Sequence, residues 1–189
     1  MTFDNDKKMH LEKDDKSIKG NIDEHIAALC NIINSKKNFY TTSSCSGRIA
    51  IYRLPDSGKK NETEWLFITH DEATLTEIMK HLENLPEEDV WFRFEPLIIH
   101  VAARTLDDAA MLLKLVQSVG MKRAGIIAVG ERYVLEIIGT ERIDTVIAKQ
   151  GDLLVDEGYL QVLVEDANSK MVKNWNNIMK LGKEMSKLV

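Results

Sequence analysis

The sequence has few cysteines and prolines and no long hydrophobic run. Its 189 residues include 2 Cys and 3 Pro. Two cysteines are too few for a disulfide framework, and they lack the paired spacing of a zinc site. The longest apolar runs are short, as at residues 97–99, whereas a membrane helix needs about 20 apolar residues. Residues 1–19 lack the apolar core of a signal peptide. We therefore expect a cytoplasmic protein with no structural metal and no membrane partner.

The chain also has fewer basic than acidic residues. The chain has 25 Lys and Arg against 30 Asp and Glu, a formal charge of -5, which argues against a polycation that binds any nucleic acid. The charge is uneven: residues 51–100 hold 11 acidic and 5 basic residues, while the segment from Ala167 onward holds five lysines and one glutamate. An acidic mean therefore leaves room for a local basic surface.

Several standard signatures are absent. The sequence has no G-x-G-x-x-G turn, no phosphate loop ending in G-K-S/T, no H-E-x-x-H and no G-x-S-x-G elbow. The ordinary nucleotide-binding and hydrolase folds thereby lose most of their support.

The pattern of apolar residues predicts an α+β protein. Its length suits a single domain over residues 1–189, with residues 1–20 as an N-terminal arm and residues 157–188 as a long C-terminal helix. We expect flanking helices and a mixed sheet of about six strands. Shorter helices are predicted at 21–36 (capped by Asn21), 70–84 (capped by Thr69 with Glu72) and 106–119 (capped by Thr105 with Asp108). Strands are predicted at 39–42, 48–54, 65–69, 90–94, 97–104, 125–129 and 133–138, with a hairpin loop at 55–62 and an irregular stretch at 139–156.

The densest polar group lies in residues 41–48, of which residues 43–47 are predicted to form a small-residue loop between two strands. Hydroxyls, a thiol and a guanidinium with little bulk suit close approach of a phosphate or carboxylate to backbone N–H groups. A tight strand connection that satisfies its own backbone is the more common interpretation of such residues. Cys45 has no neighbouring base in the sequence, so a structural or ligand-facing thiol is favoured over a nucleophile.

A second group of candidate site residues consists of Glu95, within Phe94-Glu95-Pro96, and of His100 and Arg104 further along the chain. On a strand, His100 and Arg104 face the same side, about 13 Å apart, and could line one wall of a site. A histidine among apolar residues is more often a packed, hydrogen-bonded core residue. Other charged groups at turns or strand ends, where such groups are usually solvated, are His70, Arg123, Arg132 and Glu136.

The last helix carries lysines at a regular spacing. Lys173, Lys180 and Lys187 recur every seven residues and therefore share a face. Such a stripe can hold an RNA backbone, although a solvated helix face is the ordinary interpretation.

These motifs, taken in order, resemble the tRNA wybutosine-synthesising protein 3 family. The similarity is carried by residues 40–49, Trp65-Leu66, Thr69-His70 and the stretch from Phe94 to Arg104. Further matches along nearly the whole chain are Lys19-Gly20, Asp23, Ser118 to Gly120, Ala124 to Ile126, Leu135-Glu136 and Ala167-Asn168.

The resemblance implies a function. Members are S-adenosylmethionine-dependent methyltransferases that methylate a ring nitrogen, N4, of the 4-demethylwyosine-type tricyclic guanine beside the anticodon of phenylalanine tRNA. They do not use the Rossmann-type methyltransferase fold. The expected partner is therefore the tRNA anticodon loop, with no DNA. The sequence departs from the family pattern at Ala102-Ala103 and at 135–138, which bears on the edges of the pocket and on which intermediate is accepted.

The resemblance also assigns roles to residues. Glu95 or His100 would orient or deprotonate the base, and a guanidinium would hold a phosphate or the methionine carboxylate. The expected cofactor-binding residues are Ser43, Ser44, Cys45, Gly47, Arg48 and Arg104. The expected substrate-binding residues are His70, Arg123, Arg132, Glu136, Lys173 and Lys180.

Two other classes of function stay open from the sequence. One is a hydrolase that uses Cys45 or Ser44 with His100. The other is a tRNA-binding protein without catalytic activity.

Overall fold

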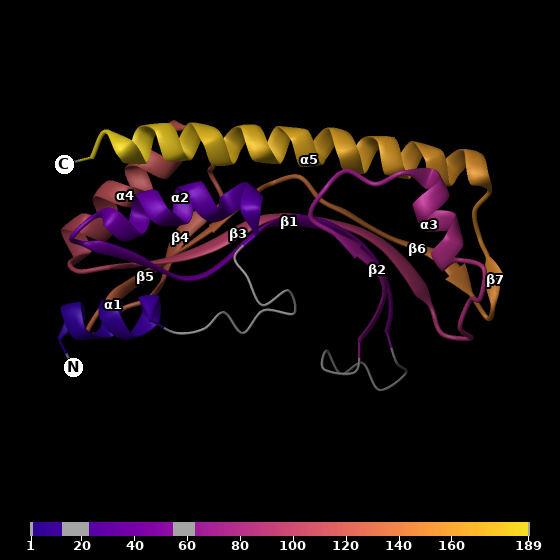
Figure 1. Ribbon diagram of the computed structural model, residues 1–189, viewed down its shortest axis with the longest axis horizontal. Helices are drawn as coiled ribbons and strands as arrows, with labels where there is room; N and C mark the ends of the chain where they lie inside the picture. Colours follow the sequence, from indigo (N-terminus) through magenta and orange to yellow (C-terminus); the bar gives the residue numbers. More distant parts are fainter. Residues whose placement is uncertain (1, 13–22, 55–62, 189) are drawn as a thin grey trace. The chain divides into compact units, whose positions relative to one another are not determined.

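The computed structural model describes residues 2–12, 23–54 and 63–188. Its strands form a sheet in the order β2-β1-β3-β5-β4, with β6 beside β3 and β7 beside β6 (Figure 1). None of the described helices is both long and apolar enough to cross a membrane. The helices are α1 (Phe3–Leu11), α2 (Glu24–Ser35), α3 (Leu75–His81), α4 (Leu106–Ser118) and α5 (Glu157–Ser186). The strands are β1 (Phe39–Arg53), β2 (Glu64–Thr69), β3 (Val90–Ala103), β4 (Ala124–Ala128), β5 (Tyr133–Ile138), β6 (Ile143–Lys149) and β7 (Asp152–Leu153).

The chain divides into two compact units. Unit 1 comprises Met1–Ser46, Leu97–Thr140 and Asn174–Val189, and unit 2 comprises Gly47–Pro96 and Glu141–Lys173. The elements β1, β3 and α5 contribute residues to both units. The single domain expected over residues 1–189 remains a prediction.

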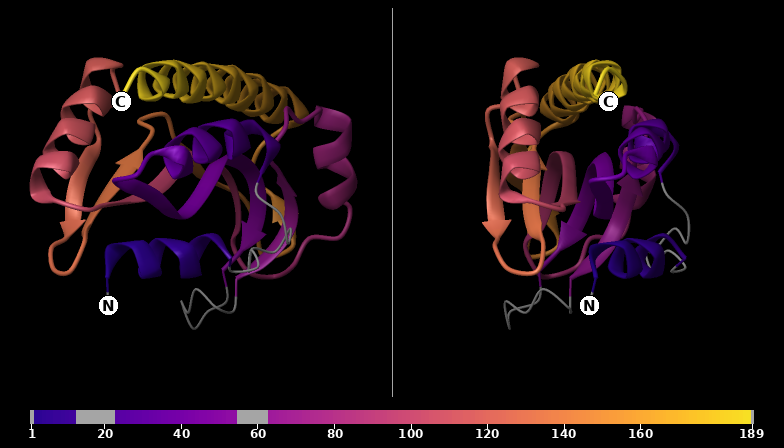
Figure 2. Two further views of the ribbon diagram at one scale, coloured as in Figure 1. Left: turned by 60° about the vertical axis from the view of Figure 1, so that its left-hand side comes forward. Right: turned by 90° about the vertical axis from the view of Figure 1, so that its left-hand side faces the viewer.

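Unit 1 has helices on both faces of its strands. Buried residues of α2, α4 and the end of α5 pack on one face, and α1 lies on the opposite face (Figure 2). The alternation of a strand explains this arrangement, because Val101 and Ala103 point to the first core while Ala102 packs with Phe3 and Tyr40. The sheet in unit 1 thus has a core face and an outer face partly covered by α1.

Unit 2 has its own sheet pairings and helices. Strand β2 pairs with β1, and β6 pairs with the first part of β3, both antiparallel. Asn168 of α5 holds the turn before α3: its Oδ1 accepts the backbone N–H of Ala73 at 2.9 Å, and its Nδ2 donates to the Ala73 carbonyl at 2.8 Å.

Buried polar groups fix the middle of β1 within unit 1. The Asn174 Oδ1 accepts the backbone N–H of Leu97 at 2.9 Å, and its Nδ2 donates to the carbonyl of Ser46. The Ser46 hydroxyl and backbone N–H both donate to Asp23, which also caps α2 by accepting the N–H of His25. One chain of hydrogen bonds therefore joins α2, β1, β3 and α5.

The α+β class is confirmed, and the sheet is not of the Rossmann type. The pairings of β1 with β2, β3 with β5 and β6, β4 with β5, and β6 with β7 are all antiparallel, whereas a doubly wound sheet is parallel. Within the described residues the sheet has seven strands rather than about six, and the stretch 139–156, expected to be irregular, contains β6 and β7.

Three local predictions were wrong. Residues 43–47 are not a loop but the middle of one continuous strand, β1. Residues 90–94 and 97–104 likewise belong mainly to a single strand, β3. Pro96, which has no N–H, falls between Phe94, the last residue paired with β6, and Ile98, the first paired with β5, so the strand continues through it.

The third wrong prediction is the start of the helix expected at residues 70–84, which is α3. It begins at Leu75, because Thr74 rather than Thr69 is the N-cap and forms a capping box with Glu77. The helix expected at 21–36 is α2, capped by Asp23. Asn21 and the hairpin loop at 55–62 lie outside the described residues.

Candidate active site

His100 lies between two polar side chains in unit 1. Its Nδ1 is 2.7 Å from the Ser43 hydroxyl oxygen, and its Nε2 is 3.0 Å from Oε2 of Glu136. The register of the sheet brings two of these together, since His100 and Glu136 are directly paired across β3 and β5. The side chains of His100 and Glu136 are 26% and 32% exposed, so the group is open to a ligand.

The hydrogen bonds determine what this group can do. A carboxylate only accepts, so the Nε2 of His100 donates to Glu136, and in the neutral ring Nδ1 is left as an acceptor for the Ser43 hydroxyl. The arrangement is that of a base oriented by a carboxylate, with a hydroxyl in contact with the base. Such a group can take up a proton from a substrate.

Two other serines of β1, Ser44 and Ser46, contact residues other than His100. The Ser44 hydroxyl bonds to the buried Cys30 thiol, whose pKa is raised by burial, with the hydrogen bond opposing that shift. Ser46 is buried against Asp23. The hydroxyl that reaches His100 is therefore that of Ser43, not that of Ser44.

Arg104 and Arg132 hold α1 on the outer face of unit 1. The Arg104 Nε donates to Asn38 Oδ1 at 3.1 Å, its Nη atoms pair with Asp4, and its guanidinium lies 4.5 Å from the centre of the Phe3 ring. Its hydrogen bond is the main cause of the lowered pKa of Asp4. A ligand carboxylate would have to displace Asp4 to bind Arg104.

Arg132 belongs to a second anchor of α1. It donates to the Tyr40 hydroxyl at 2.7 Å and to Asp6, while the Tyr40 hydroxyl donates to Asp6 at 2.6 Å. The hydrogen bond from Tyr40 is the largest cause of the lowered pKa of Asp6, with burial opposing it. Burial, followed by the bond to Asp6, raises the pKa of Tyr40 to about 12.

Unit 2 holds another group of the expected site residues. The Arg48 Nε donates to Glu95 Oε2 at 2.6 Å, and its guanidinium lies 4.7 Å from the centre of the Trp65 ring. Arg93 approaches the other oxygen of Glu95 at 3.5 Å. Gly47, in the left-handed region with φ 102°, offers its carbonyl to Nδ1 of His70 at 2.7 Å.

The remaining expected residues are separate from these groups. Lys173, in unit 2, pairs with Glu141, whereas Lys180, in unit 1, is exposed. Arg123 is exposed at the start of β4, and its carbonyl accepts the N–H of Ile138. The sequence thus named residues that unit 1 joins as one cluster (Ser43, His100, Glu136), together with others that it does not.

Sequence reasoning missed an aromatic and charged network on unit 2. Arg93 lies 4.5 Å from the centre of the Tyr52 ring and pairs with Asp144 at 2.8 Å. The Tyr52 ring is also near the rings of Trp65 and Trp91, at 5.6 and 6.4 Å. The signal in the sequence is the alternation Trp91-Arg93-Glu95, which places three such side chains on one face of a strand.

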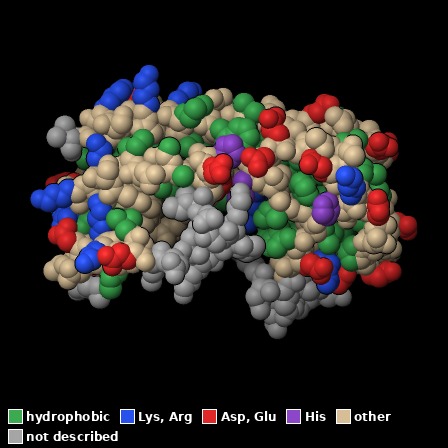
Figure 3. Space-filling view, in the orientation of Figure 1, with side chains coloured by type: hydrophobic (Ala, Val, Ile, Leu, Met, Phe, Trp, Pro, Cys, Tyr) green, Lys and Arg blue, Asp and Glu red, His purple; other side chains and the backbone are tan. Residues whose placement is uncertain are grey.

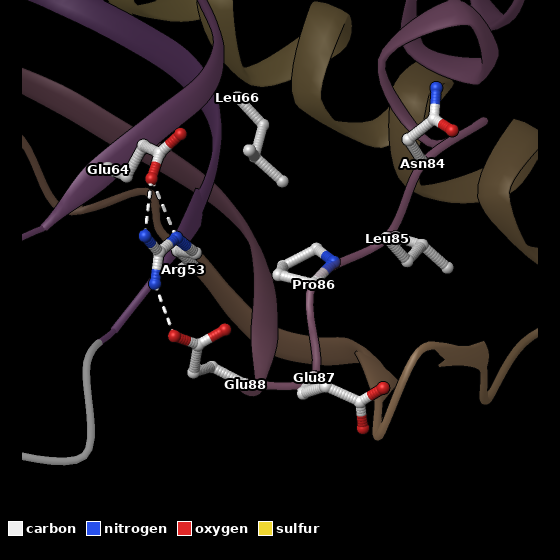
Figure 4. Close-up of a pocket in the computed structure, with 8 residues that line it drawn as sticks. All are labelled: Arg53, Glu64, Leu66, Asn84, Leu85, Pro86, Glu87 and Glu88. Atoms are coloured by element: carbon white, nitrogen blue, oxygen red, sulfur yellow. Dashed lines mark hydrogen bonds and ion pairs between the residues drawn. The ribbon is translucent and has the colours of Figure 1, made fainter.

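Unit 2 also contains a pocket of about 620 Å³ that the sequence did not suggest (Figure 4). Its only described cation, Arg53, is paired with Glu64 at 2.6 Å and also with Glu88. The lining residues are Arg53, Glu64, Leu66, Asn84, Leu85, Pro86, Glu87 and Glu88.

Comparison with known proteins identifies the class. The family model described as methyltransferase TYW3 matches residues 5–187. The chain is 40% identical over 188 residues, 98% of this chain and 95% of the relative, to the tRNA(Phe) 7-((3-amino-3-carboxypropyl)-4-demethylwyosine(37)-N(4))-methyltransferase of Thermococcus sibiricus. It is 35% identical over 185 residues, 95% of this chain and 72% of the relative, to the tRNA wybutosine-synthesizing protein 3 homolog of Danio rerio.

A solved structure agrees with these relatives. The PH1069 protein from Pyrococcus horikoshii superimposes with a TM-score of 0.91 at 35% identity, covering 99% of this chain and 97% of that one. The protein is therefore a methyltransferase with an α+β fold outside the Rossmann type. The chain belongs to the TYW3 methyltransferase family, as its motifs indicated, and its reaction requires a methyl donor.

Proposed function

We propose that this protein methylates N4 of 7-(3-amino-3-carboxypropyl)-4-demethylwyosine at position 37 of phenylalanine tRNA, a step of wybutosine synthesis, with S-adenosylmethionine as the methyl donor. The names of relatives that match nearly the whole chain support the substrate and the position of methylation. The structural observation that carries the proposal is the hydrogen-bonded group Ser43–His100–Glu136, since transfer to a ring N–H needs a proton acceptor.

The proton balance assigns a role to each member of this group. S-adenosylmethionine would supply the methyl group to the acceptor nitrogen, and its sulfur would keep the electron pair of the broken carbon–sulfur bond. The N–H proton must leave, and it passes to the Ser43 oxygen while the Ser43 proton passes to Nδ1 of His100. Glu136 stabilises the resulting imidazolium through Nε2 and is a positioning residue.

The residues around Arg48 fit the amino-acid end of S-adenosylmethionine. Only Nε of its guanidinium is engaged by a hydrogen bond within the described residues, so the Nη groups can receive a carboxylate. Glu95 can accept an ammonium group, and the Trp65 face suits a cation. When bound, the donor supplies an electrophilic methyl group. We retain Ser44, Cys45, Gly47 and Arg104 as candidate cofactor contacts, Arg104 only if Asp4 is displaced.

The RNA would be bound by the substrate-binding residues expected from the family resemblance. His70, Arg123, Arg132, Lys173 and Lys180 remain candidates for the substrate, with Glu95 as an alternative base. The target base must leave its stack to reach His100, as for other enzymes that modify bases. We further propose a cytoplasmic location, with neither DNA nor membrane as a partner.

Transfer of a labelled methyl group tests the function. The purified protein is incubated with labelled S-adenosylmethionine and tRNA(Phe) that carries the demethylated base, and the label in nucleoside digests is followed. We expect the label on the tricyclic base and none on tRNA lacking it. Binding of tRNA without any transfer would instead indicate a non-catalytic RNA-binding protein and overturn the proposal.

A serine variant tests the mechanism. Ser43→Ala should lower kcat by about 100-fold or more, the usual contribution of proton transfer, with the Kd of S-adenosylmethionine unchanged. Ser118→Ala, an exposed hydroxyl at the end of α4, is the matched control and should keep full activity. A raised cofactor Kd with an unchanged kcat would make Ser43 a cofactor contact rather than part of the proton path.

A further inference from the structure

The two units differ strongly in charge. Among the described residues, unit 1 has 12 Lys and Arg against 10 Asp and Glu, whereas unit 2 has 8 against 16. The acidic character of the whole chain therefore comes from unit 2. A polyanion such as RNA is attracted to unit 1 and repelled by unit 2.

Cations of unit 1 gather where α2 and α5 end. The Lys36 Nζ donates to the carbonyls of Ser186 and Leu188, which places it beside the last turn of α5. The carbonyl of Lys37 accepts a hydrogen bond from Arg104, the residue that follows β3, so Arg104 lies beside Lys37. We call this surface the basic end; its members are Lys36, Lys37, Arg104, Lys180, Lys183 and Lys187.

The lysines of α5 at the basic end share one exposed face. Lys180, Lys183 and Lys187 are three and seven residues apart, and all three are exposed. Leu181, Gly182 and Met185 point the other way and are buried, Gly182 against Leu29 and Ile32 of α2. Figure 3 shows Lys and Arg side chains gathered over this part of α5.

Few acids offset the charge at the basic end. Glu184 pairs with Lys187, and Asp4 pairs with Arg104. Lys7, whose Nζ donates to the carbonyl of Lys36, has a lowered pKa, first through burial and then through the charge of Arg104. Lys37 and Lys183 have no ion pair among the described residues, so their charges remain available to an anion.

We propose that the basic end binds the phosphate backbone of the tRNA whose base is methylated at His100. The inference rests on the proposed function and adds where the RNA lies. Arg104 is the residue after β3 and lies four positions beyond His100, about 13 Å away at the rise of a strand. Its guanidinium contacts the Phe3 ring, against which Ala102 packs, and His100 faces the same side as Ala102 by alternation along the strand. The anticodon loop is single-stranded, so its bases can be splayed out. A base held at His100 therefore brings the phosphates of nearby nucleotides of that loop to the basic end.

Matched charge reversals test this surface. The variant K37E/K183E changes two exposed residues of the basic end, and K80E/R142E changes two exposed residues of unit 2, so that both lower the net charge by the same amount. The Kd of unmodified tRNA(Phe) transcript is measured over a range of salt concentrations, with thermal melts to check folding and calorimetry for S-adenosylmethionine.

We expect K37E/K183E to raise the tRNA Kd by about tenfold or more and to flatten the slope of log Kd against log salt by about two. K80E/R142E should change the Kd by less than about threefold, and neither variant should alter cofactor binding. Equal losses in the two variants, or none in K37E/K183E, would overturn the proposal. Absence of methyl transfer by the unmodified protein would instead overturn the proposed function, so the two failures are distinguishable.

Discussion

The Nε2 of His100 lies 3.0 Å from Oε2 of Glu136 because the two residues are cross-strand partners in β3 and β5. A half-buried imidazole that donates to a carboxylate is fixed in one ring orientation and one tautomer. Glu136 therefore determines which nitrogen of His100 faces Ser43, although it does not itself contact Ser43 in the hydrogen-bonded group.

Glu136→Gln should lower kcat by roughly tenfold or more with little change in the tRNA KM. An amide is nearly the same size as the carboxylate but does not stabilise an imidazolium by its charge. Glu136→Asp should recover part of the activity, which a purely structural role would not produce. Asp107→Asn, at an exposed position of α4, is the control. A raised KM with an unchanged kcat would instead make Glu136 a substrate-binding residue, the role expected from the sequence.

Asn174→Ala should destabilise the protein by about 2 to 4 kcal/mol. The Asn174 side chain is 2% exposed, and its loss leaves the N–H of Leu97 and the carbonyl of Ser46 buried without that partner. Urea unfolding of both proteins measures the difference. Asn176→Ala, exposed on the same helix, should cost less than about 1 kcal/mol. Equal losses for the two variants would show that the buried amide contributes nothing specific.

The sequence predicted those features that depend on neighbouring residues. The capping box of Thr105 with Asp108 and the strand Tyr133–Ile138 are found as expected, because a cap and an alternating strand are encoded within a few positions. Residues 43–47 were predicted as a loop, and this prediction was wrong. Their hydroxyls and glycine are typical of a loop, but neighbouring strands and the Asp23 and Asn174 side chains hold them extended.

The site was predictable in its residues but not in its contacts. Alternation placed His100 and Arg104 on one side of a strand; the strand ends at Ala103, but Arg104 contacts Phe3 on the side that Ala102 faces. It did not indicate that Ser43, 57 residues from His100 in the sequence, would contact His100. Nor did it indicate that Asp4, 100 residues from Arg104, would form an ion pair with Arg104. Such pairings depend on strand order and on where α1 packs, and neither is encoded in local spacing.

Tyr40 and Tyr52 should ionise late in an alkaline titration. Burial is the first cause that raises the pKa of each to about 12, against an ordinary value of 10.0. Because the unfolded state loses its protons first, the stability that these groups contribute is complete below about pH 10 and declines as the pH rises towards 12. Absorbance at 295 nm follows the ionisation. Tyr40→Phe and Tyr52→Phe should each remove one late step, and an unchanged titration in either variant would contradict the assignment.

Asp6 should give α1 an acid-sensitive anchor. The hydrogen bond from Tyr40, followed by Arg132, lowers the pKa of Asp6 below its ordinary value of 3.8, in spite of burial. A group whose pKa is lowered on folding stabilises the folded state above its unfolded pKa, and this contribution is lost as the pH falls through the folded one. Asp6→Asn should therefore have a lower Tm than the unmodified protein at pH 7, and the difference should shrink below about pH 4. Lys8→Gln, at an exposed position of the same helix, should show no such dependence. A difference in Tm that stays constant from pH 7 to pH 3 would mean that Asp6 acts through packing alone.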